Sequence, residues 1–222
     1  MNRLLLVFLS AVVFGYSSCS SQPEETRKPD VFDDQVSRED SILIMEQMDT
    51  LNSANHMDLM TLILGSPKYN IRKIGILIYD GVNELDVMGP RYVLGQAMGA
   101  KTQLIGIKPG PVRTVMGVQL LPDVVMDSVE NLDILIVPGG FKGTIQAAYD
   151  PVIQEWIRKI DKTTQFTGAV CTGVWILGST GLLEGKMAST NWYREEEFLK
   201  KYGAVPANER YTQDGKYWTS AG

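Results

Sequence analysis

From residue 70 onward, short apolar runs alternate with amphipathic segments. The runs are rich in Val, Ile and Leu and are bounded by turn residues, which predicts buried strands. They are Ile71–Tyr79, Lys101–Ile107, Leu132–Val137 and Phe166–Val170. After Asp150-Pro151 the apolar residues follow helical spacing, with Asp suited to the N-cap and Pro to the first helical position. This alternation predicts an α/β protein with a mostly parallel sheet and helices on both faces.

Further elements are expected between and after these runs. Pro90 suits the first turn of a helix that continues to Met98. Val112–Leu121 has the pattern of a hairpin arm, and Lys186–Asn191 that of a short strand. A charged helix over Tyr193–Lys201 and a strand pair around Asp214-Gly215 complete the prediction.

The chain begins with the pattern of an export signal over residues 1–19. Arg3 precedes the apolar run Leu4–Phe14, which is too short to span a bilayer as a mature helix. The run ends in Tyr16-Ser17-Ser18-Cys19, which resembles a bacterial lipobox with Cys19 as the lipidated residue. The alternative is plain secretion with cleavage nearby. The lipobox interpretation predicts a membrane anchor and a location in the cell envelope.

Two segments separate this signal from the predicted domain at 70–222. Residues 20–40 are polar and acidic, and they are expected to form a disordered tether. Between Pro23 and Asp40 lie seven acidic and three basic residues, so this tether holds most of the formal net charge of −5. Residues 41–69 show mostly helical spacing and are expected to form a helical extension that packs against the domain.

Composition excludes several functions. The remainder of the chain is nearly neutral and carries no basic stripe, so no nucleic-acid partner is expected. Two cysteines and one histidine, His56, offer no metal-ligand spacing. The sequence therefore predicts neither a metal nor a cofactor.

The stretch Thr163–Gly181 predicts a buried strand, a sharp turn and a helix, with Cys171 at the corner. Such a corner is strained and exposes its side chain above the sheet. The helix N-terminus beneath the sulfur is expected to lower the thiol pKa, which would make Cys171 a nucleophile. The alternative is a buried packing cysteine.

Other candidate residues stand at predicted strand ends. Ligands of doubly wound sheets bind at the carboxyl ends of the strands, where Asp86, Gly139-Gly140 and Cys171 are expected to meet. Asp86 has the alternative role of a helix N-cap, and the two glycines that of a simple turn.

With these residues the chain resembles the DJ-1/PfpI superfamily, which has the class I amidotransferase-like, flavodoxin-like fold. Within the superfamily it most resembles the isonitrile hydratase branch. The resemblance covers about Ile71–Gly222. The motifs are Leu85–Pro90, Pro109–Val112, Asp133–Gly140, Val170–Gly173 and Gly181–Lys186. It implies that Cys171 is the nucleophile, that Asp86 works across from it and that Thr172 orients water. The backbone N–H groups of Gly140 and Thr172 would form the oxyanion site, with Gly139 and Asn191 beside the substrate.

Two departures from this family bear on function. Asn191-Trp192 stands where the family usually has His-Trp, and Thr172 stands where the protease and glyoxalase branches have a histidine. No Cys–His dyad is therefore expected. In addition, the relatives continue beyond the position of Gly222 through a long helix that covers the sheet, so the C-terminal part of the fold is expected to be missing.

The leading hypothesis is a cofactor-independent enzyme that hydrates an isonitrile-like carbon through a thioimidate on Cys171. A glyoxalase or deglycase activity on reactive carbonyls is the second hypothesis, and a non-enzymatic sensor or binding domain is the third. A small molecule is the expected partner, and a homodimer is left open.

Overall fold

The computed structural model describes residues 42, 46, 61, 63, 65, 66, 68–97 and 99–222. The chain divides into two units, Met1–Pro67 and Lys68–Gly222, and the fold below is that of the second unit. The predicted signal with Cys19, the acidic tether and His56 lie outside the described residues. Four described residues of the predicted helical extension are helical: Ile42, Glu46, Thr61 and Ile63.

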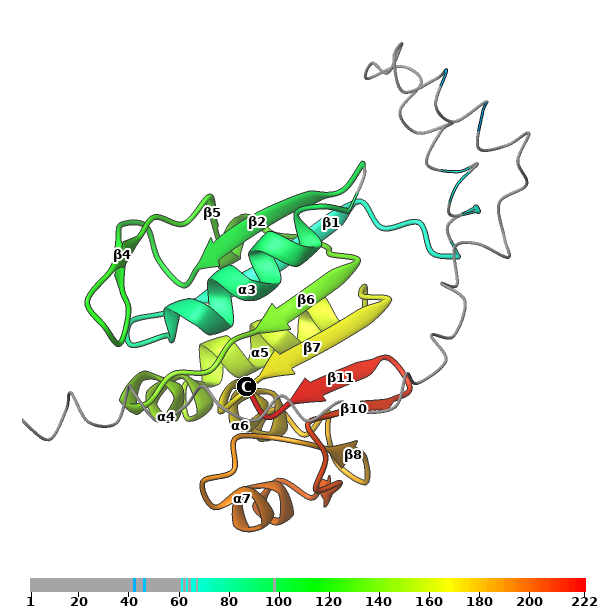
Figure 1. The fold of residues 1–222 in the computed structure, drawn as a ribbon. Coiled ribbons are helices and arrows are strands. Elements are labelled where there is room, and N and C mark those ends of the chain that lie inside the picture. The colour runs from blue at the N-terminus through cyan, green and yellow to red at the C-terminus, as the bar shows by residue number, and fades with distance from the viewer. Residues whose placement is uncertain are drawn as a thin grey trace, which may run out of the picture. The chain divides into compact units, whose positions relative to one another are not determined.

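In the described part of the chain, a seven-stranded sheet has the order β10-β11-β7-β6-β1-β2-β5 (Figure 1). All neighbouring pairs are parallel except β10 and β11, which form an antiparallel hairpin. The strands are β1 (Lys73–Ile78), β2 (Lys101–Gly106), β5 (Val124–Val125), β6 (Ile134–Val137), β7 (Phe166–Val170), β10 (Tyr211–Asp214) and β11 (Tyr217–Ser220). The predicted parallel sheet is thus confirmed, and the predicted strand pair around Asp214-Gly215 joins its edge.

Helices cover both faces of the sheet, as predicted. Helix α3 (Glu84–Leu94) lies on one face, and α4 (Lys142–Ala148), α5 (Pro151–Asp161) and α6 (Gly173–Ser179) lie on the other (Figure 1). The chain leaves β1 towards the first face and its neighbour β6 towards the second. This divergence makes the carboxyl ends of β1 and β6 the switch point of the sheet, where doubly wound proteins bind ligands.

Helix α5 follows the sequence prediction closely. Pro151 is its first residue, and the Asp150 carboxylate caps it by accepting a hydrogen bond of 2.9 Å from Val152 N. Its buried residues Ile153, Trp156, Ile157 and Ile160 form the apolar face that packs on the sheet.

Helix α3 differs from the prediction, because it begins one and a half turns before Pro90. Asn83 is the N-cap, and its side chain accepts a hydrogen bond of 3.0 Å from Leu85 N. Pro90 therefore lies inside the helix. Asp86 lies in the first turn and is not the cap. Helix α4 was not predicted, because its small and polar residues show no apolar periodicity.

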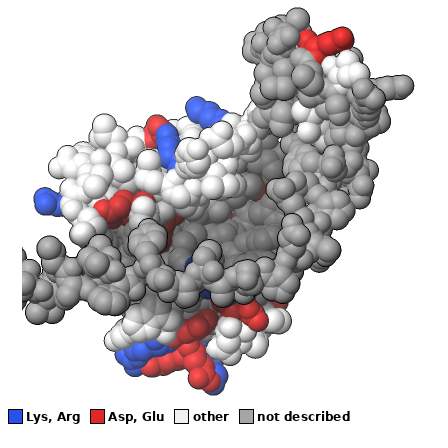
Figure 2. Space-filling view, viewed as in Figure 1, with Lys and Arg blue, Asp and Glu red and all other residues white. Residues whose placement is uncertain are grey.

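Smaller elements surround the sheet. β3 (Val112–Arg113) and β4 (Gln119–Leu120) form the predicted hairpin, while β8 (Met187–Ala188) pairs in parallel with β9 (Val205–Pro206). The acidic start and basic end of α7 (Glu195–Lys201) place charges of both signs along the lower edge of Figure 2. Ion pairs link Arg194 to Glu197 and Lys200 to Glu196, so the run of glutamates is a solvated helix face.

The hydrophobic core lies between the sheet and the helices, with Ile76, Ile78, Leu135, Ile157 and Ile176 fully buried. On the sheet face that carries α3, an apolar hollow of about 290 Å³ remains open. Its lining residues are Leu94, Ile134, Ile136, Phe166, Gly168 and Trp218. Among the described residues, no helix is long and apolar enough to cross a membrane.

Candidate active site

Cys171 occupies the predicted corner between β7 and α6. Its φ of 57° lies in the left-handed region, which is strained for a residue with a side chain. Two hydrogen bonds hold the corner: Cys171 N donates to Ser220 O at 2.9 Å, and Thr190 Oγ1 donates to Cys171 O at 2.7 Å. At Gly173 the chain passes so close to the end of β6 that a Cβ would lie 2.1 Å from Val137 O, so only glycine fits there. The predicted strained turn is therefore present.

The sulfur of Cys171 is half-buried and is surrounded by polar groups from three parts of the chain. The backbone N–H of Thr172 and the side chain of Asp86 both form hydrogen bonds with it. Asn191 Nδ2 lies 3.4 Å from Sγ and donates to it. Gly222, which follows β11, lies beside the thiol on a further side. The structure thus brings Cys171, Asp86, Thr172 and Asn191 together, as the sequence predicted.

Asp86 reaches this site from the first turn of α3 and is buried, with 8% of its surface exposed. Its Oδ2 accepts a hydrogen bond of 3.1 Å from Gly139 N. A Cβ on Gly139 would lie 2.8 Å from Asp86 Oδ2 and 2.7 Å from both Thr172 N and Thr172 Oγ1. These three polar atoms therefore converge on one point, and the absence of a side chain at Gly139 allows them to do so.

Thr172 fastens the corner to the end of β6. Its Oγ1 accepts a hydrogen bond of 3.0 Å from Gly140 N and donates one of 2.5 Å to Gly140 O. The N–H groups of Gly139 and Gly140 are thus occupied by Asp86 and Thr172, and that of Thr172 by the sulfur. In this structure the predicted oxyanion donors position side chains, and binding of a substrate oxygen by them stays a prediction.

Electrostatics corrects one expectation from the sequence. The pKa of Cys171 is raised, because burial and the charge of Asp86 outweigh the hydrogen bonds that Thr172 and Asn191 donate to the sulfur. The pKa of Asp86 is raised as well, mainly by burial. The helix that was expected to lower the thiol pKa is α6, which has only seven residues. The negative charge of either group therefore opposes ionisation of the other, so the thiol and the carboxyl group titrate as a coupled pair.

Asn191, which replaces the histidine expected from the family, is held in a defined orientation. Its Oδ1 accepts a hydrogen bond of 3.1 Å from Tyr193 N, which turns Nδ2 towards Cys171. An amide in this position can donate to the sulfur but cannot take a proton from it. The described residues therefore contain no base of the Cys–His type beside the thiol.

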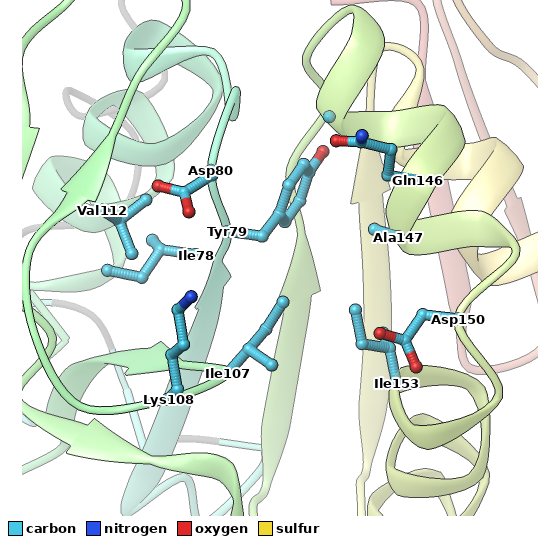
Figure 3. A pocket seen from close by; sticks show the side chains of 11 residues that line it. Ile78, Tyr79, Asp80, Ile107, Lys108, Val112, Gln146, Ala147, Asp150 and Ile153 are labelled. Atoms are coloured by element: carbon cyan, nitrogen blue, oxygen red, sulfur yellow. The ribbon is translucent and has the colours of Figure 1, made fainter.

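Three residues that the sequence did not indicate support the site. Thr190 holds the backbone of Cys171, Thr144 contacts Thr172, and Tyr79 contacts Thr144. Tyr79 lies at the end of β1 and also borders a separate open pocket of about 240 Å³, in which Lys108, Gln146 and Asp150 lie around an apolar floor (Figure 3). Nothing in the local pattern marked these residues, because their contacts join distant parts of the chain.

The described residues contain no group of three or more His, Cys, Asp or Glu side chains that could hold a metal ion. What the site does offer is a thiol, a buried carboxyl group that can exchange a proton, and fixed hydrogen-bond donors. This set can add a sulfur nucleophile to an electrophilic carbon and move protons during that addition.

Known proteins are similar to this chain in sequence. Residues 72–222 match the model of the DJ-1/PfpI family. The isonitrile hydratase of Pseudomonas putida is 33% identical over 150 residues, which cover 68% of this chain and 65% of that enzyme. A glutathione-independent glyoxalase of Caenorhabditis elegans is 33% identical over 102 residues, or 45% of this chain and 53% of that protein.

A solved structure gives the same result. The crystal structure of a ThiJ/PfpI family protein from Pseudomonas syringae aligns with a TM-score of 0.66 and 30% identity over 70% of this chain. The chain spans 64% of that protein, and thus slightly less than two thirds of both Pseudomonas relatives. The family model covers well over half of the chain, and the fold agrees with that of the solved structure. The chain therefore belongs to the DJ-1/PfpI family.

Proposed function

We propose that this protein is a cysteine-dependent enzyme that adds water to a small electrophilic carbon, with an isonitrile-like compound as substrate. The observation that carries the proposal is that the side chain of Asp86 and the backbone N–H of Thr172 both form hydrogen bonds with the thiol of Cys171. The similarity to an isonitrile hydratase supports the substrate class.

In the first step, the sulfur of Cys171 forms a bond to the terminal carbon of the isonitrile. The same carbon receives a proton from the thiol and Asp86 pair, which gives a thioimidate with an S–CH=N group. The sulfur and the proton come from the same site, so this first addition needs no further group. Burial raises the pKa of Asp86, which favours the protonated carboxyl group and so its use as a proton donor.

In the second step, a water molecule attacks the thioimidate carbon. Asp86 takes one proton from the water and passes it to the nitrogen; the C–S bond then breaks, and the sulfur takes the second proton of the water. The products are an N-substituted formamide and the free thiol, so atoms and protons balance. Asn191 supports the cycle by donating to the sulfur as it leaves.

The test incubates the full-length protein with a panel of aliphatic and aromatic isonitriles and with α-oxoaldehydes, and measures products by NMR. N-formamide formation that Cys171→Ser abolishes is the expected result, because an alcohol in this position is a far weaker nucleophile. Cys19→Ser removes the only other cysteine of the chain and serves as the matched control, with unchanged turnover. Conversion of the α-oxoaldehydes alone would replace hydration by a glyoxalase reaction.

We also propose that the enzyme is exported and anchored in the cell envelope by a lipid on Cys19. The support comes from Arg3, the apolar run Leu4–Phe14 and the Ser-Ser-Cys sequence that follows. A substrate would then be met outside the cytoplasm.

A further inference from the structure

Thr190 is a buried residue that holds the backbone of the candidate nucleophile. It is 0% exposed, and its Oγ1 donates a hydrogen bond of 2.7 Å to the carbonyl oxygen of Cys171. Cys171 has a φ of 57°, and a residue with a side chain keeps this strained conformation only where neighbouring contacts hold it. On its other side, the N–H of Cys171 donates to Ser220 O at 2.9 Å. The peptide groups before and after the nucleophile are therefore both held.

The carbonyl that Thr190 holds belongs to the same peptide group as the N–H of Thr172. A peptide group is planar and trans, so its C=O and its N–H point in opposite directions. Holding the carbonyl of Cys171 therefore fixes the direction of the Thr172 N–H, which forms a hydrogen bond with the sulfur. A donor on the carbonyl also polarises the peptide group and strengthens its N–H as a donor. Through this peptide group, the hydroxyl of Thr190 can act on the sulfur.

The segment that carries Thr190 is anchored by the hairpin of β10 and β11. The N–H of Ser189 donates to Thr219 Oγ1 at 2.9 Å, and the Ser189 hydroxyl lies 2.6 Å from Thr212 Oγ1. Both of these threonines are buried. On the other side of Thr190, Asn191 Nδ2 donates to the sulfur at 3.4 Å. Three consecutive residues thus anchor the segment, hold the carbonyl of the nucleophile and contact its sulfur.

We propose that Thr190 is a positioning residue that aims the backbone N–H of Thr172 at the sulfur of Cys171. This role rests on the proposed function, in which Cys171 is the nucleophile. The aimed N–H stabilises negative charge on the sulfur when the thiol gives up its proton and when the C–S bond breaks. Without the hydroxyl, the carbonyl of Cys171 loses its donor and the N–H is held less firmly, so the thiolate is less stable.

The experiment measures the rate at which iodoacetamide alkylates Cys171 across pH in the full-length protein, without any isonitrile. The sulfur displaces iodide and forms a thioether, which mass spectrometry assigns to its residue. Burial and Asp86 raise the pKa of this thiol, and the Thr172 N–H works against them. Weakening that N–H should therefore raise the pKa further.

Thr190→Val replaces the hydroxyl by a methyl group of similar size. We expect the midpoint of the alkylation profile to move to higher pH, and the rate at pH 7 to fall about tenfold, the change for one pKa unit. The rate of the fully ionised thiol should stay that of the unmodified protein. Only the thiolate reacts, so this pattern reports the charge of the sulfur, whereas a loss of access would slow alkylation at every pH.

Control variants separate this effect from a general loosening of the segment. Thr190→Ser keeps the hydroxyl and should give the profile of the unmodified protein. Thr212→Val removes a buried hydroxyl from the anchor of the segment but leaves the carbonyl of Cys171 with its donor, so its profile should also stay unchanged. Asp86 and Tyr79, the titratable groups that interact electrostatically with Cys171, are present in every variant. Circular dichroism checks that each variant is folded.

A double variant tests whether the effect passes through the peptide group or through the neighbouring amide. Asn191→Ala removes the side-chain donor to the sulfur. Thr190→Val should add the same shift to Asn191→Ala as to the unmodified protein, because the path from the Cys171 carbonyl to the Thr172 N–H does not include Asn191.

Three results would overturn the inference: an unchanged profile in Thr190→Val, an equal shift in Thr212→Val, or a shift that disappears beside Asn191→Ala. If Thr190→Val does not fold, NMR of the unmodified protein decides, because the amide proton of Thr172 must shift as the thiol ionises. An amide proton that does not respond contradicts the proposal. If the alkylation pattern holds but no isonitrile is hydrated, the proposed substrate is wrong and the inference stands. A Cys171 that iodoacetamide modifies at no pH contradicts both.

Discussion

Cys171 and Asp86 form a pair in which each group limits the charge of the other. Burial raises both pKa values, and the carboxylate raises that of the thiol further. Each shift favours the protonated form: the carboxyl group keeps its proton to a higher pH than an exposed aspartate does, and the thiol to a higher pH than a helix-activated thiol does. A pair of this kind is suited to delivering a proton and a nucleophile to the same carbon.

This coupling predicts the pH dependence of thiol alkylation. In the unmodified protein, the rate of Cys171 alkylation by iodoacetamide should rise with pH through a midpoint above that of an ordinary thiol. Asp86→Asn removes the opposing charge, so the thiol pKa should fall and alkylation at pH 7 should become faster, about tenfold for each pKa unit. Turnover should fall by about 10²-fold, since the proton-transfer group is lost.

Glu84→Gln is the matched control for this variant. Glu84 is the other acidic residue in the first turn of α3, and it is not among the groups that shift the pKa of Cys171. Its alkylation profile should stay that of the unmodified protein. An Asp86→Asn variant with full turnover would show that Asp86 is only a packing residue.

At the scale of elements, the site depends on how closely the turn after β6 approaches α3 and the corner at Cys171. Gly139 donates its N–H to Asp86 and leaves the space in which Asp86 and Thr172 converge. These residues lie on three elements from separate parts of the chain: α3, the turn after β6, and the corner before α6. Their contact at one glycine makes the site sensitive to a single methyl group.

Gly139→Ala should therefore disturb the site strongly. The added Cβ would lie 2.7 Å from Thr172 N and 2.8 Å from Asp86 Oδ2, distances at which atoms must move apart. We expect a loss of unfolding free energy of about 2 kcal/mol, typical of overpacking, and loss of turnover. Chemical denaturation followed by circular dichroism measures the first, and formamide formation the second.

Gly89→Ala offers a control within α3, because a Cβ there has no heavy atom within 4 Å. It should raise stability by roughly 0.5–1 kcal/mol, the usual gain for alanine over glycine in a helix, and leave turnover unchanged. If both substitutions had the same effect on stability and turnover, the site would not specifically require glycine at position 139.

At the scale of the whole molecule, the unit Lys68–Gly222 contains the candidate active site, and the N-terminal residues are proposed to anchor the protein to a membrane. If Cys19 is lipidated, the unmodified protein should sediment with membranes from the bacterial host and the Cys19→Ser variant should be found in the soluble fraction. Fractionation followed by immunoblotting measures this. The Cys171→Ser variant should still sediment with membranes, and an unchanged distribution of Cys19→Ser would disprove the anchor.

Much of the fold was determined by the sequence alone. Runs such as Leu132–Val137 are apolar on both sides and short, so burial in a parallel sheet is their stable arrangement. Asp150-Pro151 starts α5 by local hydrogen bonding and fixed backbone geometry, which need no distant contact. The small residues around Cys171 likewise predicted the strained corner, because a sharp turn between strand and helix leaves no room for larger ones.

Only the tertiary structure decided the electrostatics and the hydrogen bonding of the site. The direction of the Cys171 pKa shift depends on burial and on Asp86, which comes from another element, and neither can be read from the sequence around the cysteine. The start of α3 before Pro90 depended on the cap at Asn83. The contacts of Thr144 with Tyr79 and with Thr172 join α4 to the residue after β1 and to the corner before α6, because parallel strands bring their carboxyl ends to one edge of the sheet. Local patterns determine which elements form, while the meeting of side chains from separate elements is a property of the packed fold.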